Sequence, residues 1–152
     1  MSMDLPQKLG IALDRSDLNE AIFLILDFRT RCGFNRTQQR MLFDAYRVMF
    51  AWAIEQKVTL PGSLVDTDMD SIEGQIINQA LVELVICSAG PGNNDALAEL
   101  CAQMCRGIMR HGKPMSEVVQ RWQQQGIPPL LLARSDFFHQ VREQHFAVDL
   151  GL

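Results

Sequence analysis

The sequence predicts an all-α fold, a compact orthogonal bundle of about six to eight helices with no significant sheet. Apolar residues recur at intervals of three and four along most of the chain, which is the period of a helix that covers a core. Glycine, proline and capping residues divide the chain into segments of helical length. The 152 residues fit one domain, residues 1–152, which can bury about two-thirds of its unfolded surface.

Two helices are expected before the longest one. Pro6 suits the first turn of a short helix over residues 6–15. Asp17 begins a second helix, because Glu20 follows it at the spacing of a capping box, in which each side chain accepts a hydrogen bond from the other residue's backbone N–H. This second helix is expected to end at Cys32, directly before a glycine.

The longest helix is expected over residues 36–56, with Asn35 as its N-terminal cap. It carries two apolar stripes, whereas a helix that shields one side of a core needs only one. The stripes are Leu42, Ala45, Met49, Trp52 and Ala53, and Phe43, Tyr46, Phe50 and Ile54. The helix is therefore either central or also in contact with another chain. We predict that Tyr46, Phe50 and Ile54 bind a protein partner, because one core need not bury both stripes.

The helix that follows is apolar nearly all round and is expected at the centre of the core. It begins at Asp70 or Ser71 and extends through Cys87, after a break at residues 60–63. A buried strand over residues 81–87 is the alternative, since β-branched residues favour strands. The length of the apolar segment favours the helix.

Shorter helices are expected in the last third of the chain, after a turn at residues 90–94. They cover residues 95–110 and 114–125, and two short segments begin at Pro128 and Ser135. The tail, residues 146–152, is apolar enough to pack against a surface.

Charge is unevenly distributed along the chain. Fourteen basic and eighteen acidic residues give a formal net charge of −4, yet seven acidic residues and no basic one lie between Lys57 and Arg106. Five arginines lie close together in the first third, namely Arg29, Arg31, Arg36, Arg40 and Arg47. We therefore expect an acidic side and an arginine-rich side.

The arginine-rich segment has two interpretations. Residues 18–56 have the helix, turn and helix layout of a DNA-binding motif, and Arg36 and Arg40 lie at the start of the second helix. Contact with DNA or RNA is one interpretation, and contact with an acidic protein surface is the other. Arg40 and Asp44 also have the spacing of an ordinary i,i+4 ion pair on a solvated helix face. The net charge and this carboxylate favour the protein surface.

No motif for catalysis or cofactor binding is complete. Gly107, Gly112 and Lys113 have the spacing of a phosphate loop, but Pro114 replaces the Ser or Thr that holds magnesium. The cysteines lack the paired spacing of a zinc site, and Cys101 and Cys105 are expected to be small core residues. The sequence therefore favours a protein without enzymatic activity, cofactor or metal. A metal or redox protein that uses Cys87, Cys101 and Cys105 is the competing hypothesis.

These observations predict a helical protein-binding module in the cytoplasm, such as an adaptor, a chaperone-like protein or an assembly subunit. It is expected to form a homo-oligomer and to have no membrane segment. The alternative is a transcriptional regulator or nucleoprotein accessory subunit that contacts DNA or RNA through residues 29–47. The length of this chain, its net negative charge and its predicted helices are also features of small bacterial accessory subunits in general.

Overall fold

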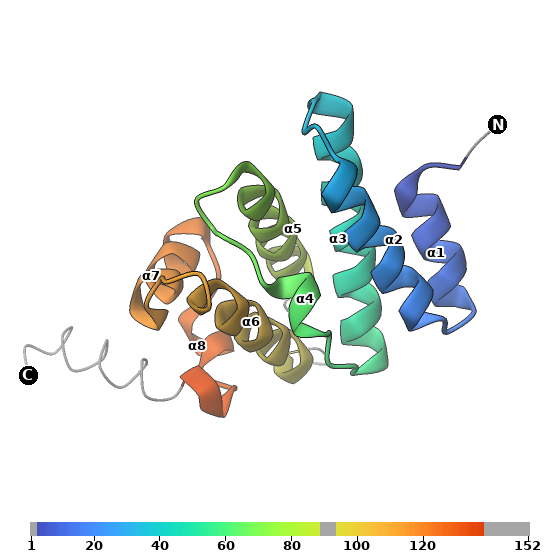
Figure 1. Ribbon diagram of the computed structural model, residues 1–152. Helices are drawn as coiled ribbons and strands as arrows, with labels where there is room; N and C mark the ends of the chain where they lie inside the picture. Colours follow the sequence, from blue (N-terminus) through green and yellow to red (C-terminus); the bar gives the residue numbers. More distant parts are fainter. Residues whose placement is uncertain (1–2, 89–93, 139–152) are drawn as a thin grey trace, which may run out of the picture.

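The computed structural model of the protein describes residues 3–88 and 94–138, and within these ranges the secondary structure is helical, without strands. The helices are α1 (Leu5–Asp14), α2 (Leu18–Arg31), α3 (Arg36–Gln56), α4 (Gly62–Val65), α5 (Ile72–Ser88), α6 (Asn94–Met109), α7 (Met115–Gln125) and α8 (Pro129–Leu132) (Figure 1). The all-α prediction is confirmed. The alternative strand over residues 81–87 is wrong, because those residues lie inside α5.

Local side-chain chemistry sets several helix starts. The Asn35 side chain accepts a hydrogen bond from the backbone N–H of Gln38 at 2.8 Å. The Gln38 side chain in turn accepts one from the backbone N–H of Asn35, so α3 begins with the expected cap. Asp17 accepts from the N–H of Glu20 at 3.1 Å but forms no reciprocal capping box. Ser71 accepts from a backbone N–H in the first turn of α5, which confirms one of its two expected starts.

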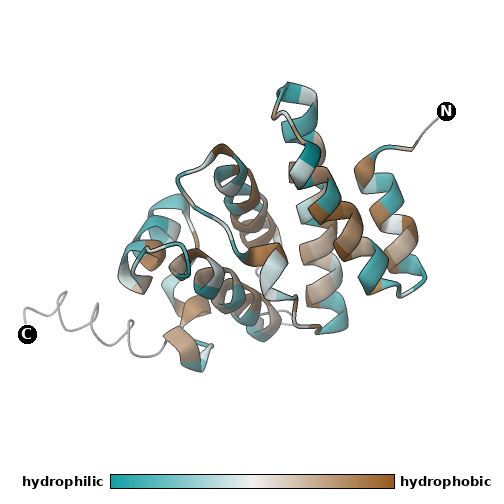
Figure 2. Ribbon diagram, viewed as in Figure 1, coloured by the Kyte–Doolittle hydropathy of each residue, from teal (hydrophilic) through white to brown (hydrophobic). Residues whose placement is uncertain are grey.

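The helices form two groups joined mainly by the contacts of α3 with α5 and α6. Helices α1, α2 and α3 lie together at one end of the molecule, and α5, α6, α7 and α8 lie at the other, with α4 between them (Figure 1). Helix α3 packs against α1 on one side and against α5 and α6 on the other. Apolar residues concentrate on these central helices and also occur along α2 (Figure 2).

Because α3 has neighbours on both sides, it buries residues of both its apolar stripes. Tyr46 and Phe50 are fully buried, and Ile54 is 8% exposed. The expectation that these three side chains remain available to a partner is therefore wrong. Their rings and methyl groups already pack in the core of this chain, beside Leu42 and Met49 from the other stripe. The central position of α3 therefore accounts for the burial of residues from both stripes.

Two glycines allow close packing around the segment that connects α4 to α5. A Cβ atom on Gly74 of α5 would lie 1.8 Å from the carbonyl oxygen of Asp68, and one on Gly107 of α6 would lie 1.9 Å from that of Val65. Both positions therefore need glycine for reasons of space. Packing thus accounts for Gly107. The residues before it form α6, whereas a phosphate loop needs a strand there.

No helix in the described ranges is both long enough and apolar enough to cross a bilayer. The apolar tail expected at residues 146–152 and most of the turn expected at residues 90–94 lie outside the described residues.

Candidate protein-binding groove between α3 and α5

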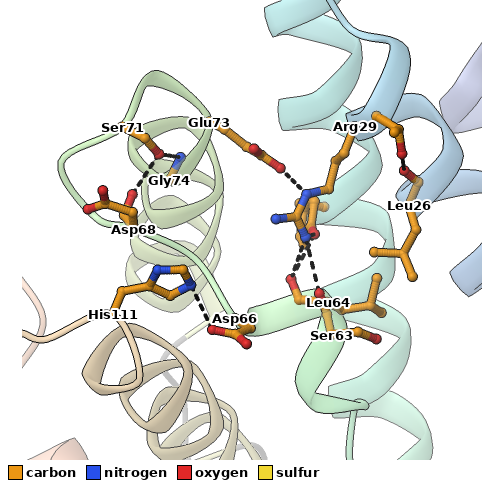
Figure 3. A network of polar contacts seen from close by, with 12 residues as sticks. Leu26, Arg29, Ser63, Leu64, Asp66, Asp68, Ser71, Glu73, Gly74 and His111 are labelled. Carbon is orange, nitrogen blue, oxygen red and sulfur yellow. Dashed lines mark hydrogen bonds and ion pairs between the residues drawn. The ribbon is translucent and has the colours of Figure 1, made fainter.

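The five arginines do not form one exposed face, because Arg29 points into the protein (Figure 3). Its side chain is 14% exposed and forms an ion pair with Glu73 of α5. The guanidinium also donates hydrogen bonds to the hydroxyl of Tyr46 at 2.9 Å and to the carbonyl oxygens of Ser63 at 3.3 Å and Leu64 at 3.4 Å. Arg29 therefore joins α2 to α3, α4 and α5, and its predicted role in partner contact is wrong.

This partly buried cluster, which we name the Arg29 clasp, pairs the guanidinium of Arg29 with Glu73 and Tyr46. Burial disfavours the charge on Arg29, but Tyr46 and Glu73 more than offset this effect and raise the pKa of the guanidinium. Burial also raises the pKa of the Tyr46 hydroxyl, although the nearby guanidinium opposes the shift. That hydroxyl donates to the Leu64 carbonyl oxygen at 2.7 Å. The clasp therefore stabilises the fold by pairing the Arg29 guanidinium and the Tyr46 hydroxyl within the chain.

Most of the exposed arginines have acidic neighbours. The pairs are Arg31 with Asp27, Arg40 with Asp44 at 3.3 Å and Arg47 with Glu83 at 4.0 Å. The ion pair expected between Arg40 and Asp44 is thus confirmed. Among the described residues, Arg36 is exposed and forms no ion pair. The local excess of positive charge is small, because three of the four exposed arginines are already paired.

Three arginines share one face of α3 with Phe43. Arg36, Arg40, Phe43 and Arg47 follow one another at steps of three or four residues, which places them along a single line on the helix. The guanidinium carbons of Arg40 and Arg47 lie 5.6 Å and 5.9 Å from the centre of the Phe43 ring. Both distances are within the range of cation–π attraction. The half-buried ring therefore lies between two cations at the surface.

A shallow groove of about 300 Å³ runs beside this ring, between α3 and α5. It is lined by Gln39, Phe43, Ile72, Gln75, Ile76 and Gln79. Ile72 is 58% exposed, which is high for a large apolar side chain. The lining holds no charged group, so it can take an apolar side chain and offer amide hydrogen bonds to a polar backbone. We name this feature the α3–α5 groove.

The sequence interpretation missed a second surface feature, the apolar character of α2. Only Ala21 and Ile25 of this helix are buried, and Phe23 is 61% exposed. Several of its other large apolar side chains are only partly covered. A signal was present in the sequence, because residues 21–26 are an unbroken run of apolar side chains. Such a run cannot all face one core in an amphipathic helix.

The three cysteines of the metal or redox hypothesis do not share one environment. Cys101 and Cys105 are buried in α6, whereas Cys87 is exposed near the end of α5. Burial raises the pKa of the Cys105 thiol to about 12, with Arg106 opposing the shift, and burial also raises that of Cys101. In the described part of the chain, His, Cys, Asp and Glu side chains form no group of three or more that could hold a metal ion.

Comparisons with protein-family models, with curated proteins and with solved structures find no match to this chain.

Proposed function

We propose that the protein is a cytoplasmic protein-binding module whose α3–α5 groove takes an amphipathic, acidic segment of a partner. The observation that carries this proposal is the juxtaposition of an uncharged, partly apolar groove with a line of arginines at its α3 edge. Its four cysteines are free thiols, as in most proteins of reducing compartments.

The apolar part of the groove favours a side chain from a partner over a small polar ligand. An apolar anchor inserted between Phe43, Ile72 and Ile76 would cover the most exposed of these side chains. Grooves of this kind bind an amphipathic helix of a partner through apolar side chains spaced by three and four residues. The volume, about 300 Å³, is at the lower limit of pockets for small molecules.

The arginines at the edge give the proposal its charge preference. Arg36 is exposed, and Arg40 can exchange its exposed carboxylate neighbour for one on a partner at little cost. Acidic side chains that flank an apolar anchor would therefore meet Arg36 and Arg40. Such charges act mainly on the association rate and on specificity.

Nucleic acid remains the second candidate, but it has less support. Binding to a duplex needs several unpaired cations, since each neutralised phosphate releases counterions. Arg29 is held in the clasp and only 14% exposed, and Arg40 and Arg47 have carboxylates within 4.0 Å. Of the five arginines, Arg36 is thus the one with neither burial nor an acidic neighbour among the described residues.

The test is a selection from phage-displayed peptides of about 15 residues, which is about four helical turns. Selected peptides are expected to carry apolar residues three or four apart, flanked by Asp or Glu. Fluorescence anisotropy then measures the affinity of a selected peptide for the wild-type protein and for variants. Ile72→Ser and the double variant Arg36→Glu, Arg40→Glu should each weaken binding at least about tenfold.

Two controls make this test specific. Leu130→Ser changes another exposed apolar residue, 73% exposed, and should leave peptide affinity unchanged. Fluorescent duplex and single-stranded oligonucleotides should show no binding that the double variant abolishes. A selection without groove-dependent peptides would contradict the proposal. Salt-sensitive oligonucleotide binding that disappears in the double variant would establish the second candidate instead.

A further inference from the structure

We propose that a second copy of this chain binds to the face formed by α1 and α2, so that the protein forms a symmetric dimer. This α1–α2 face consists of apolar residues with a charged rim. The apolar residues at its centre are Met3, Leu5, Leu24, Phe28 and Met41, which line one hollow. The exposed Phe23 lies on α2 one turn before Asp27, which also lines this hollow. The face does not include the α3–α5 groove, so the two proposals can fail independently.

The first argument is the excess of apolar surface on α2. Phe23 is 61% exposed, Met3 is 48% exposed, and Leu24 and Phe28 are only partly covered by this chain. Leu24, Phe28 and Met41 line a hollow of about 330 Å³ between α1, α2 and α3. Large apolar side chains exposed beside such a hollow are characteristic of interfaces.

The second argument is the composition of the rim, which indicates the occupant. Asp4 and Asp27 carry two negative charges, and Lys8 and Arg31 carry two positive charges, so the rim is neutral. Asp27 and Arg31 pair with each other in the single chain. Under two-fold symmetry every residue of one copy meets the same surface of the other, so a rim with equal numbers of both signs complements itself. A neutral rim has no comparable preference for nucleic acid or for a strongly acidic protein.

Sedimentation velocity between about 1 µM and about 100 µM tests the dimer. The wild-type chain should form a dimer that dissociates on dilution. In a symmetric dimer each substitution removes a contact from both copies, so Phe23→Ser should raise the dissociation constant about a hundredfold, about tenfold for each copy. Leu130→Ser and Ile72→Ser should dimerise as the wild type does. Phe23 is exposed, so its replacement should leave the far-ultraviolet circular dichroism spectrum unchanged.

A charge exchange tests the identity of the occupant. Asp27→Arg and Arg31→Asp should each dimerise more weakly alone, since each rim then carries an excess of one sign. An equimolar mixture of the two variants should form a heterodimer more tightly than either variant forms its own dimer. A wild-type chain that stays monomeric, a Phe23→Ser dimer of unchanged affinity, or a mixture no tighter than its components would each overturn the proposal. Association that continues past the dimer would overturn its symmetric form.

Discussion

Helices α2 and α5 are both rich in apolar residues on several sides, yet the structure places them in opposite environments. In α5 the buried residues are Gly74, Ile77, Asn78, Ala80, Leu81, Val82, Leu84 and Val85. In α2 they are Ala21 and Ile25. A helix with apolar residues on several sides is therefore central only where several other helices pack against it. At the edge of a bundle, the same character indicates surface that another molecule can cover.

The neighbours of the two helices explain the difference. Helix α5 packs extensively against α3, and on another side Trp122 of α7 donates a hydrogen bond to the buried amide oxygen of Asn78 at 2.7 Å. Helix α2 packs mainly against α1 and is fixed to α5 through the Arg29 clasp. The outer side of α2, around Phe23, has no comparable neighbour in the described chain.

Glycine-to-alanine substitutions should give the largest difference in the free energy of unfolding between a central helix and a peripheral one. Gly74→Ala in α5 should destabilise the fold by about 4 kcal/mol or more, because its Cβ would lie 1.8 Å from a backbone oxygen. Gly10→Ala in α1 should stabilise the fold by about 0.5–1 kcal/mol, because its Cβ meets nothing within 4 Å and alanine favours the helix. Urea denaturation measures both. Equal effects from the two substitutions would remove the distinction.

Truncation of a large apolar side chain gives the next largest contrast. Leu81→Ala in α5 should lower the free energy of unfolding by about 2–5 kcal/mol, since this side chain is fully buried. Phe23→Ala in α2 should change it by about 0.5 kcal/mol or less in the monomer, since this ring is mostly exposed. Both values come from denaturation at low protein concentration. A large loss for Phe23→Ala under those conditions would mean that the ring already packs within its own chain.

The clasp that holds α2 to α5 should give the smallest effect, which depends on pH. The folded pKa of Tyr46 lies above its unfolded value of about 10. Its contribution to stability is therefore complete below about pH 10 and is lost as pH rises above that value, by at most about 1.4 kcal/mol per pH unit.

Tyr46 is the only tyrosine of the chain, so tyrosinate absorbance reports directly on its ionisation. The native protein should show little tyrosinate at a pH at which the urea-unfolded protein is ionised. Tyr46→Phe should remove the tyrosine contribution to the loss of stability above pH 10. The buried thiols Cys101 and Cys105 add a similar loss from about pH 9 upward, so the comparison requires the same cysteines in both proteins. Identical titration in native and unfolded protein would contradict the buried clasp.

Features set by residues close together in the chain could be predicted from the sequence. Contacts between segments far apart in the chain could not. The all-α class, the cap at Asn35 and the Arg40–Asp44 pair follow from spacings of three or four residues. The burial of Arg29 does not follow from local spacing, because its partner Glu73 lies 44 residues away along the chain. The prediction that Tyr46, Phe50 and Ile54 bind a partner was wrong for the same reason, because their burial depends on which helices flank α3. The apolar run in α2 is visible in the sequence. Its exposure could not be predicted, because it depends on which other helices pack against α2.

Hydrogen exchange read by mass spectrometry tests the contrast between α2 and α5 most directly. Peptides covering residues 18–31 and 72–88 are compared in the wild type and in Phe23→Ser, at about 1 µM and about 100 µM. We expect amides of α2 to exchange more slowly in the wild type at the higher concentration, and to lose this additional protection in Phe23→Ser. Amides of α5 should exchange slowly and equally under all four conditions. Protection of α2 that is unchanged by concentration and by the substitution would contradict the account.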